Sequence, residues 1–347
     1  MTKGRRDQRA LHKPHPLLGL TMGDPAGIGP EVILASYTRM RRAPRGFFVV
    51  GGSQVLHTAL EKRGQELPII EIADPSDARA AFKAGLPVLT GADAAYTPGK
   101  PSDEGAALAL YSLSEATRCV LLGQASALVT APVAKGQLAR VGFEYPGQTE
   151  FLAQVCGLAF DDAVMMLAGP SLRTVPLTVH VALADAPKLL SPDLIVHKAR
   201  IVAAALARDF GIASPRIAVA ALNPHAGEGG KFGGEEAQII EPAIASLRKE
   251  GFDVTGPVPG DALFTPVMRR HFDAALCMYH DQALIPLKAL DFDEGVNVTL
   301  GLPIIRTSPD HGTAFDIAGS GKANPGAMMA AIRMAGDCVA ARAAGDA

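Results

Sequence analysis

Three histidines follow predicted strands at the point where each strand runs out into a loop. His180 comes after the run 174–179, His225 lies in the segment 223–227, and His280 follows the run 274–279. Strand ends are where α/β enzymes gather site residues, and neutral imidazoles suit a borderline divalent metal. The spacing matches no local metal motif. The pattern alone therefore leaves two interpretations open, a shared metal site or three hydrogen-bonded structural histidines.

Cationic and amide side chains follow at nine-residue intervals, as Lys288, Asn297 and Arg306, in a segment that is otherwise apolar or turn-like. Lysine supplies a compact charge and arginine a bidentate fork, so together they could hold a phosphate and a carboxylate. Taken singly, each charge is also typical of an ordinary protein surface. An anionic substrate is the functional interpretation of the set.

Two glycine-rich segments could approach a ligand closely. Residues 21–31, TMGDPAGIGPE, join a strand to a helix, but their spacing is neither the P-loop nor the GxGxxG fingerprint, so a tight structural turn is an equal alternative. Residues 311–319, HGTAFDIAG, continue to Asn324. If the ligand is a dinucleotide, Asp316 could bind a ribose hydroxyl pair and Asn324 an adenine edge.

The elements that must position these residues alternate along the chain. Apolar strands at 17–22, 47–50, 68–72, 87–90 and 127–130 are separated by helical patterns, including a long one at 103–122. Shorter elements follow, among them an amphipathic helix at 191–209 and strands at 216–222, 274–279 and 296–300. This rhythm predicts an α/β fold with a parallel or mixed sheet.

Composition narrows the functional class. The 347 residues correspond to about two domains. Lys and Arg number 33 against 35 Asp and Glu, so no bulk positive field favours nucleic acid. No run reaches the roughly 18 apolar residues of a membrane helix, and no signal peptide is recognisable. The four cysteines form no CxxC pair. We expect a cytoplasmic globular protein with no nucleic-acid or membrane partner, whose metal ligands would not be cysteines.

Several segments together resemble the 4-hydroxythreonine-4-phosphate dehydrogenase family. They are TMGDPAGIGPE at 21–31, TAPVAKG at 130–136, NPHAGEGG at 223–230, YHDQ at 279–282 and HGTAFDIAG at 311–319. The resemblance implies a fold like that of isocitrate and isopropylmalate dehydrogenases, with two α/β/α domains around a cleft. The first domain would comprise residues 15–133 and 301–347 on the cofactor side. The second would comprise residues 134–300, on the metal and dimer-interface side.

The same resemblance implies the chemistry. One divalent metal (Zn, Mg or Co) would be held by His180, His225 and His280, one of them supplied by the partner in a homodimer that shares its active sites. Metal-dependent, NAD- or NADP-linked oxidation of 4-phosphooxy-L-threonine at C3, followed by decarboxylation to 3-amino-2-oxopropyl phosphate, would serve vitamin B6 biosynthesis.

Site roles follow residue by residue from that resemblance. The expected substrate contacts are Gln148, Thr149, Lys288, Asn297 and Arg306, and the expected cofactor contacts are Gly312, Ala314, Asp316, Ile317 and Asn324. Asp261, Asp281 and Lys288 are the candidate catalytic groups, with either aspartate a proton acceptor or a neighbour of the metal.

One departure from the family pattern affects substrate recognition. The family usually has Gly-His-Thr-Glu where this chain has Gly147-Gln148-Thr149-Glu150. Glutamine donates a hydrogen bond but cannot titrate or become cationic near neutral pH. A relative acting on phosphorylated threonate or erythronate, or on a cyclic diol carboxylate, is therefore an alternative. A tri-histidine hydrolase or lyase without nicotinamide and a silent metabolite-binding protein are remoter ones, and the 311–319 segment argues against the former.

Overall fold

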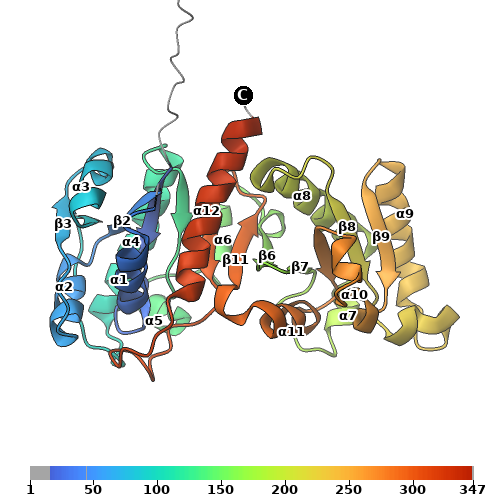
Figure 1. The fold of residues 1–347 in the computed structure, drawn as a ribbon. Helices are drawn as coiled ribbons and strands as arrows, with labels where there is room; N and C mark the ends of the chain where they lie inside the picture. Colours follow the sequence, from blue (N-terminus) through green and yellow to red (C-terminus); the bar gives the residue numbers. More distant parts are fainter. Residues whose placement is uncertain (1–15, 44, 346–347) are drawn as a thin grey trace, which may run out of the picture.

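The computed structural model describes residues 16–43 and 45–345, and within them the chain forms one twelve-stranded sheet covered by helices (Figure 1). The strands are β1 (Leu17–Thr21), β2 (Gly46–Val50), β3 (Ile69–Ile72), β4 (Leu86–Leu89), β5 (Ala127–Val129), β6 (Val164–Ala168), β7 (Arg173–Pro176), β8 (Arg216–Ala220), β9 (Asp253–Val258), β10 (Ala274–Cys277), β11 (Val296–Leu300) and β12 (Arg306–Pro309).

The α-helices are α1 (Gly29–Met40), α2 (Ser53–Lys62), α3 (Ala78–Ala84), α4 (Asp103–Leu121), α5 (Lys135–Arg140), α6 (Gln148–Val155), α7 (Ala186–Leu189), α8 (Pro192–Phe210), α9 (Glu241–Lys249), α10 (Gly260–Leu263), α11 (His280–Asp291) and α12 (Gly326–Gly345). Short helical turns are η1 (Pro75–Asp77), η2 (Phe160–Asp162), η3 (Pro224–Gly230), η4 (Glu236–Ile240), η5 (Met268–Arg270) and η6 (Phe292–Glu294).

Two parallel halves meet in an antiparallel centre. The strand order is β3-β4-β2-β1-β5-β12-β11-β6-β7-β10-β8-β9. In this order, the six neighbours from β3 through β12 pair in parallel at one end of the sheet. The four neighbours β7, β10, β8 and β9 pair in parallel at the other end. The joints β12–β11, β11–β6 and β6–β7 are antiparallel. The fold is therefore mixed α/β, as expected from the alternation of elements.

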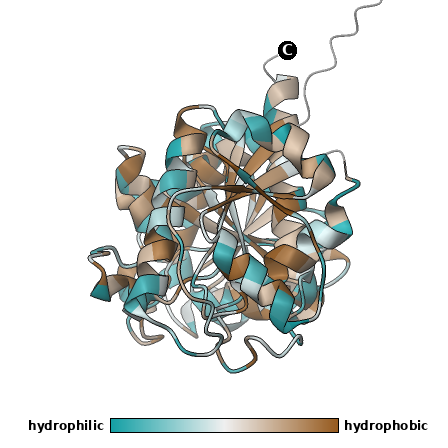
Figure 2. Cartoon of the chain, turned by 90° about the vertical axis from the view of Figure 1, so that its left-hand side faces the viewer, coloured by the Kyte–Doolittle hydropathy of each residue, from teal (hydrophilic) through white to brown (hydrophobic). Residues whose placement is uncertain are grey.

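Alternating side chains bury both faces of the sheet, as is usual for parallel strands. In β2, Phe47 and Val49 belong to one core cluster while Phe48 and Val50 belong to a second on the opposite face. Viewed from one end, hydrophobic strands lie at the centre, and hydrophilic segments lie on the surrounding helices and loops (Figure 2). Helices α1, α12 and α8 cover the first face.

The two faces differ in continuity. The first cluster extends across both halves, from Val49 in β2 to Val219 in β8. On the other face the core is divided into a cluster that includes Leu138 and Phe143 and a separate one that includes Leu167. All three of these residues also line one cavity of about 660 Å³. The cavity therefore lies where the second face has no continuous apolar core.

The predicted division into two domains stays a prediction. Its boundary at residue 300 falls between β11 and β12, which are hydrogen-bonded neighbours in the sheet. Helix α12 packs against β12, β5 and β11 and also against α8, so it crosses the middle of the molecule in Figure 1. Residues 15, 44, 346 and 347 of the predicted first domain lie outside the described residues.

Candidate active site

The floor of the central cavity is made by the three antiparallel strands β6, β11 and β12. Asn297 pairs with Ser308 on one side and Leu167 on the other, and Thr299 pairs with Arg306 and Met165. Cross-strand partners of this kind point to the same face of a sheet. Of this set, Met165, Leu167, Asn297, Arg306 and Ser308 line the cavity. Strand pairing thus brings an arginine and an amide together on one surface.

Arg306 is a buried cation held by neutral oxygens. Its side chain is 4% exposed, and its guanidinium donates to Thr130 Oγ1 at 2.8 and 3.2 Å, to Thr299 Oγ1 at 3.0 Å and to Gln148 Oε1 at 3.2 Å. Burial lowers the pKa of Arg306 to about 10, an effect that nearby Glu150 opposes. The group is therefore charged at neutral pH. A buried cation without a bonded carboxylate is suited to receive an anion.

Further polar groups surround this cation. Asn297 Oδ1 is buried and has no hydrogen-bond partner among the described residues, which favours a ligand donor at that point. Helix α6 begins at Gln148 and Thr149, which both line the cavity, so its free N–H groups add positive potential. Lys288 Nζ also lines the cavity and lies 3.2 Å from Asp310 Oδ2.

Two of the three histidines meet at the cavity. His180 follows β7 and His280 begins α11 after β10, and because β7 and β10 are parallel neighbours the rings come within 6.0 Å, centroid to centroid. The pKa of His180 is lowered, chiefly by partial burial and then by Lys135 and His280. His280 Nδ1 lies 2.7 Å from Asp281 Oδ1, an arrangement that orients the ring and leaves Nε2 free.

The other predicted catalytic and metal residues lie elsewhere. His225 lies in η3 with φ at +51°, and its ring centroid is 6.2 Å from that of Phe232, with the two rings tilted by 43°. It lines neither the central cavity nor a smaller one of about 250 Å³ that His180 and His280 also border. Asp261, in α10, is exposed and lines neither cavity. Over the part of the chain that the structure describes, no cluster of three His, Cys, Asp or Glu side chains could hold a metal. One chain therefore supplies two neighbouring histidines.

The predicted cofactor segment begins at the rim of the same cavity, because His311 and Gly312 line it. Asp316 is exposed, whereas Ala314 and Ile317 pack on the first core cluster. The Asn324 side chain donates to Asp293 Oδ1 at 3.0 Å and accepts from the Gly326 N–H at 2.9 Å. The segment is thus anchored on its apolar side and at its end, with a carboxylate exposed between.

Residues 21–31 support that segment from behind. The N–H of Ile28 donates to the Thr313 carbonyl at 2.9 Å, and a Cβ on Gly27 would stand only 2.7 Å from the same oxygen. Glu31, 1% exposed, accepts a hydrogen bond from the Gly319 N–H. The glycines permit close contact between two chain segments, so the structure favours the structural interpretation of this motif.

Sequence reasoning assigned no role to three cavity residues. Thr130 and Lys135 lie in the TAPVAKG segment, and the position of Thr130 directly after an apolar strand could have drawn attention to it. His311 Nε2 is buried without a partner in the part of the chain that the structure describes, while Nδ1 lies 3.0 Å from the Gly312 carbonyl. No spacing signal marks His311, because its position depends on β12.

Comparison with known proteins identifies the family. A family model described as pyridoxal phosphate biosynthetic protein PdxA matches residues 44–335. A protein of Erythrobacter litoralis (strain HTCC2594) named 4-hydroxythreonine-4-phosphate dehydrogenase is 62% identical over 335 residues, which are 96% of this chain and 99% of that protein. The chain belongs to the PdxA family. The resemblance stated from the sequence motifs is thereby confirmed.

Other PdxA relatives match most of the chain. A Zymomonas mobilis protein of the same name is 51% identical over 320 residues, covering 92% of this chain and 94% of that protein. The crystal structure of the Klebsiella pneumoniae 4-hydroxythreonine-4-phosphate dehydrogenase has a TM-score of 0.83 at 38% identity, covering 94% of this chain and 98% of that one. This PdxA family member is an oxidoreductase. None of its helices, over the described residues, is long and apolar enough to cross a membrane.

Proposed function

We propose that this enzyme oxidises 4-phosphooxy-L-threonine at C3 with NAD or NADP and then decarboxylates the product to 3-amino-2-oxopropyl phosphate, in pyridoxal 5'-phosphate biosynthesis. The names of its relatives indicate the substrate. The observation that carries the proposal is Arg306, a buried cation bonded only to neutral oxygens and facing a cavity that also contains two histidines. A doubly anionic substrate of this kind supplies the missing counter-charge.

The chain's own residues would bind the anionic ends of the substrate. Arg306 and the N-terminus of α6, with Gln148 and Thr149, form the larger positive surface and would receive the phosphate. Lys288, from α11, would balance the carboxylate, and the orphaned Asn297 oxygen would accept a hydrogen bond from the substrate. Gln148 is engaged through its oxygen by Arg306, which leaves its amide hydrogens free to donate.

The histidines present fit a divalent metal as part of a ligand set. The lowered pKa of His180 keeps its ring neutral, as ligation requires, and Asp281 orients His280. We infer that His225 of a second copy would complete the set in a homodimer, since His225 lies apart from the pair within one chain. When bound, Zn, Mg or Co would supply Lewis-acid chemistry that acidifies the C3 hydroxyl and stabilises charge on the oxygen during decarboxylation.

The nicotinamide cofactor would lie along residues 312–324. Gly312 borders the substrate cavity, Ala314 and Ile317 are held against the core, and exposed Asp316 would accept hydrogen bonds from a ribose. Asn324 would contact the adenine end. When bound, the nicotinamide would supply a hydride acceptor for C3, while the C3 hydroxyl gives up its proton to a base. On loss of carbon dioxide, the electron pair of the broken carbon–carbon bond would stay on the substrate until a proton is added.

Proton transfer needs a group at the cavity wall. Of the three candidate catalytic residues, Lys288 lines the cavity, whereas Asp281 is engaged with His280 and Asp261 lies outside the cavity. We therefore assign to Lys288 the delivery of the proton that replaces carbon dioxide, and to Asp281 the orientation of the His280 imidazole. Asp261 of a second copy would accept the proton of the C3 hydroxyl. Substrates lacking an amino group, such as 4-phospho-threonate or erythronate, would use the same groups.

The test is reduced-nicotinamide formation by the purified protein on 4-phosphooxy-threonine, phosphothreonate and phosphoerythronate in parallel, each with and without a chelator. We expect chelator-sensitive turnover that is fastest on phosphooxy-threonine. Preference for an acid without the amino group would move the proposal to that substrate. Absence of turnover on all three would contradict it.

A further inference from the structure

A second cationic cavity lies away from the site described above. Its volume is about 250 Å³, and it is enclosed by the turn between β6 and β7, by the first residues of β7 and β8, and by η5. Four arginines line it, and one carboxylate accompanies them. They are Arg173, Arg216, Arg269, Arg270 and Asp273. The lining therefore carries a surplus of three positive charges.

Both oxygens of the single carboxylate, that of Asp273, already accept hydrogen bonds from Arg216. Asp273 Oδ1 accepts from Arg216 at 3.0 Å, and its Oδ2 accepts from Arg216 Nε at 3.2 Å and from the Arg216 backbone N–H at 2.8 Å. Arg216 also donates to the Arg270 carbonyl at 3.0 Å. This fork-to-fork pair accounts for one arginine. The other three guanidinium groups have no carboxylate of the cavity left to bind.

Backbone carbonyls hold two of the remaining arginines in place. Arg173 donates to the Asp273 carbonyl at 3.2 Å and lies over the ring of Phe210, 5.2 Å from its centroid. Arg269 donates to the Ser171 carbonyl at 3.4 Å, while its Nε is buried and has no hydrogen-bond partner within residues 16–43 and 45–345. A buried donor without an acceptor costs free energy, and a multi-oxygen anion would satisfy it.

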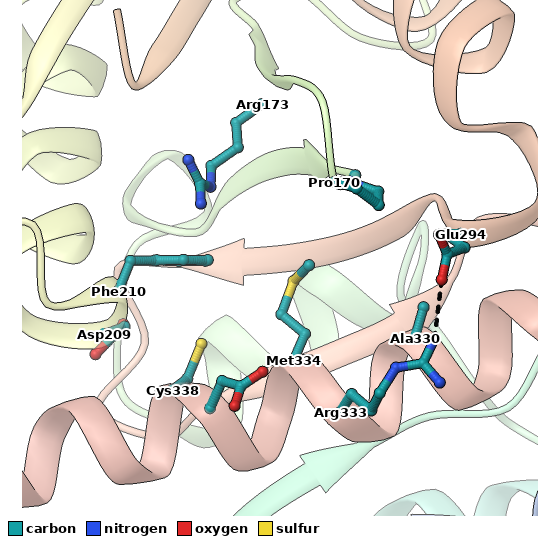
Figure 3. Close-up of a pocket in the computed structure, with 11 residues that line it drawn as sticks. Pro170, Arg173, Asp209, Phe210, Glu294, Ala330, Arg333, Met334 and Cys338 are labelled. Carbon is teal, nitrogen blue, oxygen red and sulfur yellow. Dashed lines mark hydrogen bonds and ion pairs between the residues drawn. The ribbon is translucent and has the colours of Figure 1, made fainter.

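The neighbouring cavity supplies no counter-charge for Arg173. Figure 3 shows this larger cavity, of about 370 Å³, in which Arg333 is joined to Glu294 while Arg173 stands apart. Its other carboxylates are also engaged elsewhere, since Asp209 pairs with Arg208 and Arg342, and Asp337 pairs with Arg45. Among the described residues, Arg173 therefore lines both cavities without a direct ion pair, and only the Asp273 carboxylate, already bonded to Arg216, acts on its charge from a distance.

The strand directions separate this cavity from the proposed active site. Arg173 and Arg216 are the first residues of β7 and β8, and Asp273 directly precedes β10. These three strands are parallel neighbours, so their amino ends share one edge of the sheet. His180 and His280 follow the carboxyl ends of β7 and β10. The arginine cavity thus lies at the opposite end of the strands that carry the histidines.

We propose that this arginine cavity is a second anion site, which binds a small phosphate-class dianion independently of the substrate cavity. Arg173 and Arg269 would form its inner contacts, and Arg270 would close its outer side.

The experiment is calorimetric titration of the full-length protein with inorganic phosphate at constant ionic strength. Because the substrate cavity is also expected to bind phosphate, the titration is repeated with R306M, which removes that cavity's main cation. We expect R306M to retain one phosphate site per chain. The variant R269Q/R270Q changes one half-buried and one exposed residue, so the fold should be kept, and it should weaken this site about tenfold or more.

Controls distinguish a built site from general attraction. R118Q changes an exposed arginine that pairs with Glu115 on α4, far along the chain from the cavity, and should leave both phosphate affinities unchanged. Titration of wild-type protein with chloride at matched ionic strength should give no saturable heat. Equal phosphate affinity of the second site in wild-type and R269Q/R270Q protein would overturn the proposal, as would loss of all phosphate binding in R306M. The dehydrogenase assay reports separately on the proposed function.

Discussion

Arg306 is the first residue of the short buried strand β12, so its positive charge lies inside the molecule. Its hydrogen-bond acceptors are two threonine hydroxyls and an amide, so the charge is solvated by the chain but not neutralised. Burial of this charge therefore costs the folded protein desolvation free energy, which a bound anion would offset. Arg306 is therefore better suited to binding an anion than to stabilising the fold.

Arg306→Ala should raise KM for the phosphorylated substrate by about 10- to 100-fold, because a hydrogen bond to a charged group contributes roughly 1.5–3 kcal/mol. kcat should change less, and the melting temperature without ligand should stay close to that of the wild type, since an unneutralised charge is removed. Steady-state kinetics and a thermal melt measure both. Arg118→Ala, on the surface of α4, is the control; an unchanged KM in Arg306→Ala would remove the residue from the substrate site.

Among the elements, the pair formed by residues 21–31 and 311–319 shows how a motif can act through packing. Gly27 faces Thr313 so closely that any side chain there would displace the second segment. The contact lies behind the proposed cofactor contacts, which Ala314 and Ile317 fix against the core. Substitutions in residues 21–31 should therefore weaken binding of the cofactor proposed to contact residues 311–319.

Gly27→Ala should raise KM for the nicotinamide cofactor roughly tenfold, since overpacking of this kind costs about 1–3 kcal/mol, while KM for the phosphorylated substrate moves less. Kinetics with each reactant varied in turn give the comparison. Gly136→Ala provides the matched control, because a Cβ on this helical glycine would meet no atom within 4 Å. Equal effects of Gly27→Ala on both KM values would contradict a local displacement of the cofactor segment.

The same turn contains a buried acid, Asp24, which is 2% exposed and accepts a hydrogen bond from the Ala26 N–H at 3.0 Å. Burial raises the pKa of Asp24 above its ordinary value of 3.8, against the effect of that bond. The folded protein then holds the proton to higher pH than the unfolded chain does. The contribution of Asp24 to stability must therefore fall as pH rises from about 3.8 through the folded-state pKa.

Asp24→Asn keeps the acceptor and removes the charge, so it should stabilise the protein at neutral pH, with a gain that shrinks on acidification. Denaturant unfolding at several pH values measures the difference from wild type. Asp74→Asn is a control of opposite sign, because hydrogen bonds from Ser76 lower the pKa of Asp74. A gain from Asp24→Asn that does not vary with pH would show that charge burial is not its cause.

Local periodicity predicted most helices and strands, because the spacing of apolar residues depends only on residues that are close together in the sequence. The amphipathic helix expected at 191–209 is α8, and the runs at 47–50 and 296–300 are β2 and β11. Strand β12 escaped prediction because Arg-Thr-Ser-Pro has no apolar pattern and is a strand only through its neighbours β5 and β11. In the site, the expected contacts Gln148, Asn297 and Arg306 meet in one cavity. His225 and Asp261 do not join them within one chain, a result that no spacing along the sequence could reveal.

At the scale of the whole molecule, the incomplete histidine set leads to a test of shared active sites. His180→Ala and His225→Ala should each abolish metal-dependent turnover while leaving the fold intact. If the set is completed across a homodimer, mixing and re-associating the two inactive variants should restore up to about a quarter of wild-type activity, because half of the dimers are mixed and one of their two sites is intact. Each variant mixed with itself is the control. Failure to restore activity in verified mixed dimers would contradict the shared site.

The position of β12 at the centre of the sheet also bears on how the chain is made. Synthesis proceeds from the N-terminus, so β5 and β11 exist before the strand that lies between them, and α12, which packs over both, comes later still. A nascent chain that has reached only residue 300 has two sheet edges at its middle with nothing between them. Such edges pair readily with other chains. The enzyme should therefore depend on chaperone protection until its last segment emerges from the ribosome, and truncation before β12 should yield aggregate and not a smaller folded protein.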